Sequence, residues 1–181
     1  IKQLNGEGLQ PRFHQLDITD KASIDRIGQF LKSTYGGLDI LVNNAGIIFK
    51  ATATEPFKVQ AEVNLATNFW GTLNVCNTLF PLLRPHPRVV NISSMGSQMI
   101  AKKCSTELQK KFTDPDLTMA NLEQLMNEFV SSAKDDCLKQ KGWPESEYGV
   151  SKVGVTLMSF AQQKQFNSNS REDIIVNAVS Q

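Results

Sequence analysis

Residues 38–46 read LDILVNNAG, and this short stretch predicts how the chain folds. Its first part, Leu38 to Val42, is mostly apolar, which is typical of a strand buried on both faces in a parallel sheet. Asn43, Asn44 and Gly46 then favour a turn, and Gly46 has no side chain to keep a ligand away from the backbone. In open parallel sheets, ligands bind at the carboxyl ends of the strands. The stretch therefore predicts a strand that leads into a nucleotide-binding turn, although Asn and Gly could also serve the turn alone.

Strands and helices alternate along the rest of the chain. A length of 181 residues suffices for one domain with a substantial core, so we interpret residues 1–181 as a single dinucleotide-binding and catalytic domain. A helix end is predicted at 1–8, strands at 12–17, 38–42, 88–93 and 174–178, and helices at 21–35, 57–83 (bent or broken) and 148–166. This alternation predicts an α/β fold, with a doubly wound Rossmann-type parallel sheet covered by helices.

The segment 95–147 interrupts this alternation, and we interpret it as a helical insertion. A short helix is predicted near 105–112 and a longer one near 119–139. In the longer helix apolar side chains recur at helical spacing, so one of its faces is expected to pack on the rest of the domain. These side chains are Leu122, Leu125, Met126, Phe129, Val130, Ala133 and Cys137.

A tyrosine followed four residues later by a lysine, Tyr148 and Lys152, is the pattern that carries most chemistry. On a helix the two side chains share one face and lie one turn apart. A nearby positive charge lowers the pKa of a phenol, which brings that pKa toward the range in which an acid–base catalyst works. Any exposed helix can carry this spacing by chance, so the pattern gains weight only from its neighbours along the chain.

Two further polar residues are candidates for the same site as Tyr148 and Lys152. Asn68 falls inside a predicted helix, where its side chain competes with the backbone for hydrogen bonds, so a bend or a functional role would explain it. Ser94 follows the strand 88–93, where a serine either closes a turn or faces a ligand.

Together, NNAG at 43–46, Asn68, NISS at 91–94 and YGVSK at 148–152 resemble the short-chain dehydrogenase/reductase superfamily. The GWP at 142–144 and the long insertion are similar to the animal monomeric NADPH-dependent carbonyl reductases. The resemblance implies hydride transfer from NADPH to a small-molecule carbonyl substrate, a ketone, aldehyde or quinone. It also implies four catalytic residues, Asn68, Ser94, Tyr148 and Lys152.

The resemblance assigns a role to each of these four residues. Tyr148 would donate a proton to the carbonyl oxygen, and Ser94 would hydrogen-bond the same oxygen. Lys152 would assist the tyrosine and hold the nicotinamide ribose, while Asn68 would support the proton relay.

Cofactor and substrate residues follow from the same resemblance. The implied cofactor-binding residues are Asp17, Ile18, Asn44, Ala45, Gly46, Tyr148 and Lys152. Asp17 would accept a hydrogen bond from the adenine amino group with Ile18 beside the ring, although a helix cap would also explain the acid. Phe49 and Trp143 are expected as aromatic walls of the substrate pocket.

Two parts of the family pattern are missing from the sequence. It contains no glycine-rich phosphate-binding loop, and no Pro-Gly segment follows the last predicted strand. We therefore expect a fragment of a longer carbonyl reductase that lacks the first two strands and the C-terminal segment. In the strand order 3-2-1-4-5-6 the strand 38–42 would then be an unpaired edge. We expect the 181-residue chain alone to fold marginally, bind NADPH poorly and turn nothing over.

Composition argues against several other classes of protein. A formal net charge of +1, with no cluster of Lys and Arg, disfavours a nucleic-acid partner. His14 and His86 are far apart, so no metal site is expected. The three cysteines show no disulfide or metal spacing, which favours a cytoplasmic protein. No apolar run approaches the roughly 18 residues that cross a membrane, and the resemblance implies a monomer.

Two alternative functions stay open, and a third is disfavoured. A non-catalytic nucleotide-binding sensor or scaffold could share the fold, although the complete set of polar residues argues against it. A sugar-nucleotide epimerase also uses Tyr-x-x-x-Lys, but it needs a substrate domain for which no residues remain. A Ser-His-Asp hydrolase is disfavoured because His86 lies at the opposite end of the strand 88–93, roughly 20 Å from Ser94. No G-x-S-x-G elbow is present either.

Overall fold

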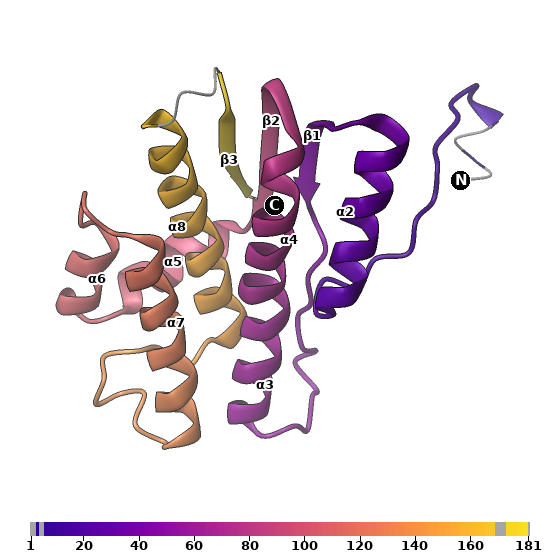
Figure 1. Ribbon diagram of the computed structural model, residues 1–181. Helices are drawn as coiled ribbons and strands as arrows, with labels where there is room; N and C mark the ends of the chain where they lie inside the picture. The colour runs from indigo at the N-terminus through magenta and orange to yellow at the C-terminus, as the bar shows by residue number, and fades with distance from the viewer. Residues whose placement is uncertain (1–2, 4–5, 169–172, 181) are drawn as a thin grey trace.

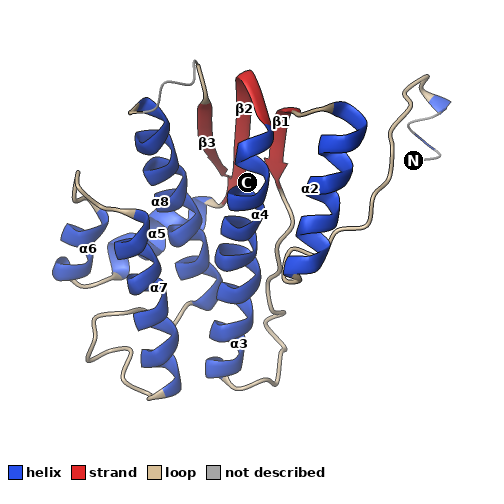
Figure 2. Cartoon of the chain, in the orientation of Figure 1, coloured by secondary structure: helices blue, strands red, loops and turns tan. Residues whose placement is uncertain are grey.

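The computed structural model of the protein describes residues 3, 6–168 and 173–180. Within these residues, three strands form one parallel sheet in the order β1-β2-β3, namely β1 (Leu38–Asn43), β2 (Leu83–Ser93) and β3 (Ile175–Ser180). Helices α2 (Lys21–Tyr35), α4 (Thr72–Leu79) and α8 (Glu147–Asn167) lie on one side of the sheet (Figures 1 and 2). This arrangement confirms the predicted α/β class with a parallel sheet.

The remaining helices follow β1 and β2 along the chain. They are α3 (Phe57–Asn64), the π-helix η1 (Leu65–Gly71), the short 3₁₀-helix η2 (Phe80–Leu82), α5 (Met95–Lys103), α6 (Thr106–Phe112) and α7 (Met119–Lys134).

Strand register brings the carboxyl ends of the strands together. Leu41 pairs with Val89, and Val89 pairs with Val176. All three side chains are buried, because they point toward the helices. Farther along, Asn43 pairs with Asn91, so both strands reach the same edge of the sheet and their following turns lie side by side.

The opposite face of β1 is open to solvent. Ile40 and Val42 are 63% and 54% exposed, so the prediction that this strand is buried on both faces is wrong. The helices α2 and α4 next to β1 pack on its other face only. β1 is also an edge of the three-stranded sheet, as expected from the sequence.

Helix α2 begins and ends where the sequence predicts. The Asp20 side chain accepts hydrogen bonds from the backbone N–H groups of Ala22 and Ser23, which caps the first turn. Gly36 ends the helix with φ of 74°, a left-handed conformation that glycine adopts without strain.

The predicted bent or broken helix at 57–83 is one continuous helical path with a defect. α3 passes into the π-helix η1 at Leu65, and α4 starts at Thr72. Asn68 lies in the middle of η1. A π-turn inserts one extra residue per turn and often marks a functional site.

The core consists of two clusters of buried side chains. One lies between the sheet and helices α2, α4 and α8, and it contains Leu41, Val89 and Val176. The other lies around α7, α8 and η1, and it contains Phe69, Met126 and other apolar residues. The second cluster shows that the apolar face of α7 packs on the rest of the domain, as its spacing predicts.

Three details of the predicted secondary structure are wrong. Residues 12–17 form no strand, because no neighbouring strand is available to accept their backbone hydrogen bonds, and Phe13 is 76% exposed. Helix α5 was not predicted. α7 ends at Lys134 instead of 139, and Asp136 beyond it has a positive φ of 54°.

The start of β2 also differs from the prediction. β2 starts at Leu83, with a register shift in its pairing between Leu38 and Ile40 of β1. Pro85 and Pro87 lie in the shifted part of β2, where they need not donate to the ladder. The predicted helix end at 1–8 falls partly outside the described residues.

Candidate active site at the carboxyl ends of the strands

A small cavity of about 150 Å³ lies where β1 and β2 end. It is lined by Asn44, Gly46, Ile47, Ile48, Ile92, Tyr148 and Lys152. The turn after β1, the end of β2 and the first turns of α8 thus meet at one place. The structure brings together four of the residues singled out in the sequence, two from the turn and two from the helix.

Tyr148 and Lys152 face the same cavity from α8. The Lys152 Nζ lies 5.6 Å from the centroid of the Tyr148 ring. Tyr148 is half-buried, whereas Lys152 is only 6% exposed. The spacing of four residues therefore produces the shared face that the sequence predicts.

The Lys152 ammonium is held at the end of β2. Its Nζ donates a hydrogen bond of 2.7 Å to the backbone carbonyl of Ile92. Burial lowers the pKa of Lys152, because desolvation disfavours the charged form. An ammonium has three N–H groups, so donors remain for a ligand in the cavity.

Gly46 brings the backbone of the turn close to both polar groups. A Cβ at this position would lie 3.0 Å from Asn68 Oδ1 and 3.8 Å from Lys152 Nζ. A larger residue would crowd Asn68 and fill space next to the ammonium. Glycine here therefore keeps a shallow cradle open beside Lys152.

Asn68 fastens the turn after β1 to the π-helix. Its Oδ1 accepts a 2.8 Å bond from the Ile47 N–H, and its Nδ2 donates a 2.9 Å bond to the Ile47 carbonyl. The side chain is 1% exposed, so this paired contact is shielded from water. The asparagine that looks unfavourable for a helix is explained by these bonds.

Ser94 begins α5. Its Oγ accepts a hydrogen bond of 3.2 Å from the Gly96 N–H, which makes it the N-cap of that helix. With an N–H on one lone pair, the hydroxyl keeps its own proton for donation. Ser94 follows β2 directly, but it is not among the residues that line the cavity.

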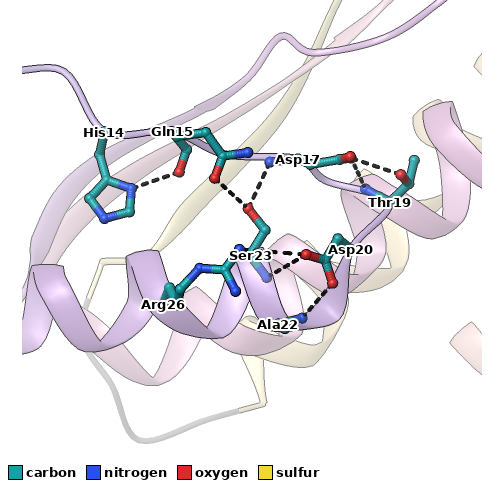
Figure 3. Close-up of polar contacts among 8 residues, drawn as sticks. All are labelled: His14, Gln15, Asp17, Thr19, Asp20, Ala22, Ser23 and Arg26. Atoms are coloured by element: carbon teal, nitrogen blue, oxygen red, sulfur yellow. Dashed lines mark hydrogen bonds and ion pairs between the residues drawn. The ribbon is translucent and has the colours of Figure 1, made fainter.

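The Asp17 carboxylate lies near the start of α2, as Figure 3 shows, and the residue is exposed to solvent. Its Oδ1 accepts hydrogen bonds from the Thr19 hydroxyl (2.7 Å) and the Thr19 N–H (2.8 Å). The hydrogen bond from the Thr19 hydroxyl is the main cause that lowers the pKa of Asp17, and the hydrogen bond from the Thr19 N–H is the second. Asp20, not Asp17, caps α2, so the alternative explanation of Asp17 as the cap of that helix is wrong.

Two residues expected at the ligand sites lie in the core instead. Ile18 is 8% exposed, and a Cβ at Gly71 would lie 3.0 Å from its side chain, so Ile18 packs on the helix and not beside an open ligand site. Trp143 is 4% exposed and packs between the rings of Phe112 and Phe129, 5.9 Å and 5.4 Å away. In this structure neither side chain presents much surface to a ligand, and the contacts of Ile18 with the adenine and of Trp143 with the substrate stay predictions.

The other expected residues lie on the turn after β1. Ala45 is exposed and Phe49 is half-buried, and neither is among the residues that line the cavity. Ile47, Ile48 and Ile92 do line it, and none of the three was predicted from the sequence. The sequence signal that could have indicated them is their position, directly after NNAG for Ile47 and Ile48 and inside NISS for Ile92.

The described residues contain neither a cluster of metal ligands nor a helix that could span a membrane. No group of three or more His, Cys, Asp or Glu among them could hold a metal ion. None of the helices in this part of the chain combines the length and apolar character that crossing a bilayer requires.

Comparison with known proteins identifies the class. The family model described as short chain dehydrogenase matches residues 1–106, so the chain belongs to this family. The chain is 49% identical over 179 residues to "Carbonyl reductase [NADPH] 1" from Bos taurus and 48% identical to "Carbonyl reductase [NADPH] 3" from Rattus norvegicus. The matches cover 98% of the chain and 65% of each relative, so this chain spans less than two thirds of their length.

Solved structures share the fold. Salutaridine reductase from Papaver somniferum superposes with a TM-score of 0.83 at 26% identity, covering 99% of this chain and 71% of that one. Menthone neomenthol reductase from Mentha piperita gives a TM-score of 0.77 at 29% identity, covering 92% and 69%.

Proposed function

We propose that the protein is an NADPH-dependent carbonyl reductase that reduces ketones, aldehydes or quinones, with Tyr148 as the proton donor. The observation that carries this proposal is the convergence of Tyr148 and Lys152 on a cavity lined by Asn44 and Gly46. The names of the relatives support NADPH as the cofactor. Since those relatives are longer than this chain, the proposal concerns the full-length product of the gene.

The residues present fit the nicotinamide end of the cofactor. The cradle beside Gly46 lets a ligand approach the backbone, and Lys152 keeps free N–H donors there for the hydroxyl groups of a ribose. The cavity of about 150 Å³ is too small for a whole dinucleotide, so it would hold only one part of it. When bound, NADPH supplies the hydride.

The protein's own residues would manage the carbonyl oxygen. Tyr148 donates its phenolic proton to the oxygen as negative charge develops there, in the role of general acid. The Lys152 ammonium lies 5.6 Å from the ring centroid and favours the phenolate that remains. The Ser94 hydroxyl, whose proton is free to donate, stabilises the same charge.

Two further residues would act at a distance from the carbonyl. Asn68 holds the turn after β1 in place and keeps Gly46 next to Lys152. Asp17 has an exposed carboxylate, and we assign it to the adenine amino group as a hydrogen-bond acceptor. Both roles are part of the proposal.

The test is an NADPH-oxidation assay of the full-length protein with a panel of quinones, aldehydes and ketones, repeated with Tyr148→Phe. The variant lacks only the hydroxyl group. We expect turnover to fall by about 10²- to 10⁴-fold while NADPH still binds, as measured by calorimetry. Wild-type turnover in the variant would refute the assignment. NADPH binding by the wild type without any turnover would favour the alternative of a non-catalytic sensor.

A further inference from the structure

Ser151 lies between the two functional residues of α8 and is completely buried, with 0% of its surface exposed. Its hydroxyl donates a hydrogen bond of 2.7 Å to the backbone carbonyl of Tyr148. Its Oγ also accepts a hydrogen bond of 3.0 Å from Asn68 Nδ2. A hydroxyl has one proton, so its bond to the carbonyl fixes the direction in which it must accept from Asn68.

These bonds join the cavity-lining turn to the first turn of α8. Ile47 is bonded to Asn68 through both its N–H and its carbonyl, Asn68 is bonded to Ser151, and Ser151 is bonded to Tyr148. Asn68 and Ser151 are both shielded from water, where hydrogen bonds are stronger and broken ones cost more. Ser151 is therefore a direct link between the turn and the tyrosine.

The neighbouring turn of α8 is held from another side. The backbone carbonyl of Lys152 accepts hydrogen bonds from Ser93 Oγ at 3.1 Å and from Thr156 Oγ1 at 3.0 Å. Ser93 belongs to β2, so this contact fixes α8 against the strand. It leaves the link to the turn after β1 to Ser151.

We infer that Ser151 is a positioning residue. Its hydrogen bonds fix the position and the rotation of the first turn of α8, so that Tyr148 and Lys152 point into the cavity. It touches no reacting atom and acts through Asn68 and the Tyr148 carbonyl. The inference rests on the proposed function only where it concerns turnover. Its structural part concerns the location of the tyrosine ring alone.

Ser159 provides a matched control on the same helix. It is also buried (1% exposed), its Oγ donates a 2.9 Å bond to the Val155 carbonyl, and it accepts a 2.9 Å bond from Asn91 Nδ2. Ser151→Ala and Ser159→Ala thus remove the same kind of bonds. They differ in their partners: Ser151 is bonded to Asn68, whereas Ser159 is bonded to Asn91 in β2.

The first readout does not require activity. The NMR spectrum of the full-length protein labelled with ¹³C at the tyrosine Cζ contains one resonance from Tyr148, which is identified by its loss in Tyr148→Phe. We expect Ser151→Ala to shift the Tyr148 resonance and Ser159→Ala to leave it unchanged. If Ser151→Ala does not fold, Ser151→Cys fills a similar space with a weak donor and should give the same shift.

The second readout is the kinetics of the full-length protein. A displaced catalytic group costs up to about 10²-fold in rate, so we expect Ser151→Ala to lower kcat by roughly 10-fold or more, with little change in KM for the carbonyl substrate. The pH–rate profile should move in Ser151→Ala and stay in place in Ser159→Ala. Equal behaviour of the two variants in the resonance and in kcat would overturn the inference. Absence of NADPH-dependent turnover in the wild type would refute the proposed function, and the NMR comparison would still decide the role of Ser151.

Discussion

Lys152 carries its ammonium group into a site where only 6% of the residue is exposed to water. A lysine in such surroundings costs stability, because the charged form loses hydration. The single carbonyl of Ile92 offsets part of this loss through the 2.7 Å hydrogen bond. Residues kept at a cost to stability are typical of functional sites.

Replacing this lysine should therefore separate stability from function. We expect Lys152→Met to be more stable than the wild type near neutral pH and to lose both NADPH affinity and turnover. Burial lowers the pKa in the folded state from the ordinary 10.5, so the unfolded state binds the proton more tightly. The cost in stability is therefore fully present at a pH below the pKa of Lys152 in the folded state. As the pH increases from that folded-state pKa toward 10.5, the free energy of unfolding of the wild type rises.

Urea unfolding of both proteins at neutral and alkaline pH measures this effect. The advantage of Lys152→Met should shrink at the higher pH. A variant that is less stable than the wild type at both pH values, or that keeps full turnover, would contradict this account of Lys152.

The spacing along the sequence predicts which side chains meet where a single helix fixes their geometry. Tyr148 and Lys152 meet because residues four apart share a helical face. The burial of Trp143 was not predicted because its neighbours Phe112 and Phe129 come from other elements of the insertion. Ser151 was overlooked for the same reason, since its partner Asn68 comes from another helix.

Among the elements, α8 is the central one, because it packs on the sheet, on α7 and on η1. Gly154 marks a close approach of α8 to α7 and η1. A Cβ there would lie 2.7 Å from Met126 Sδ and 2.9 Å from Phe69 Cδ2. The small residue lets α7 and the π-helix lie directly against α8.

Gly154→Ala should destabilise the protein by about 1–3 kcal/mol, because the added methyl group overpacks this contact. The matched control is Gly96→Ala in α5, where the nearest atom to a new Cβ is Ser94 Oγ at an ordinary 3.5 Å. The control should be neutral or slightly stabilising. Thermal unfolding compares the two, and equal stability of the two variants would contradict the close packing.

The insertion also predicts the state of assembly. Helix α7 covers α3 and α8 with its apolar face, so these two helices are less available for contacts between subunits. We expect the full-length protein to be a monomer in sedimentation experiments at micromolar concentration. A stable tetramer would show that assembly uses another surface or displaces the insertion.

Elements with their own capping and periodic signals were predictable from the sequence. α2 has Asp20 before it and Gly36 after it, and both ends match the prediction. Residues 12–17 have the alternation of a strand, but a strand exists only where a partner accepts its hydrogen bonds. Helix α5 lacks a clear apolar periodicity, and its cap, Ser94, was interpreted only as a catalytic residue.

On the scale of the whole molecule, the sheet has helices on one side and an open face at β1. Ile40 and Val42 are both more than half exposed there. Two exposed apolar side chains on one face of a strand favour association or binding of apolar molecules.

We expect the 181-residue chain to bind a hydrophobic fluorescent dye and to lose most of that signal in the double variant Ile40→Thr and Val42→Thr. Threonine keeps the preference for strands while adding a polar group. Val59→Thr on α3, at a residue that is 38% exposed, is the control and should leave the signal unchanged. A wild-type chain that binds no dye, or a double variant that binds as much, would contradict the open face.

We propose that the full-length protein transfers a hydride from NADPH to a carbonyl carbon. The most direct measurement uses NADPH deuterated at the transferable position of the nicotinamide ring, the full-length protein and a ketone from the active panel. We predict one deuterium on the carbinol carbon of the alcohol product, formed by the wild type and reduced by about 10²- to 10⁴-fold in rate with Tyr148→Phe. An alcohol without deuterium, or no alcohol with any carbonyl compound in the panel, would contradict the account.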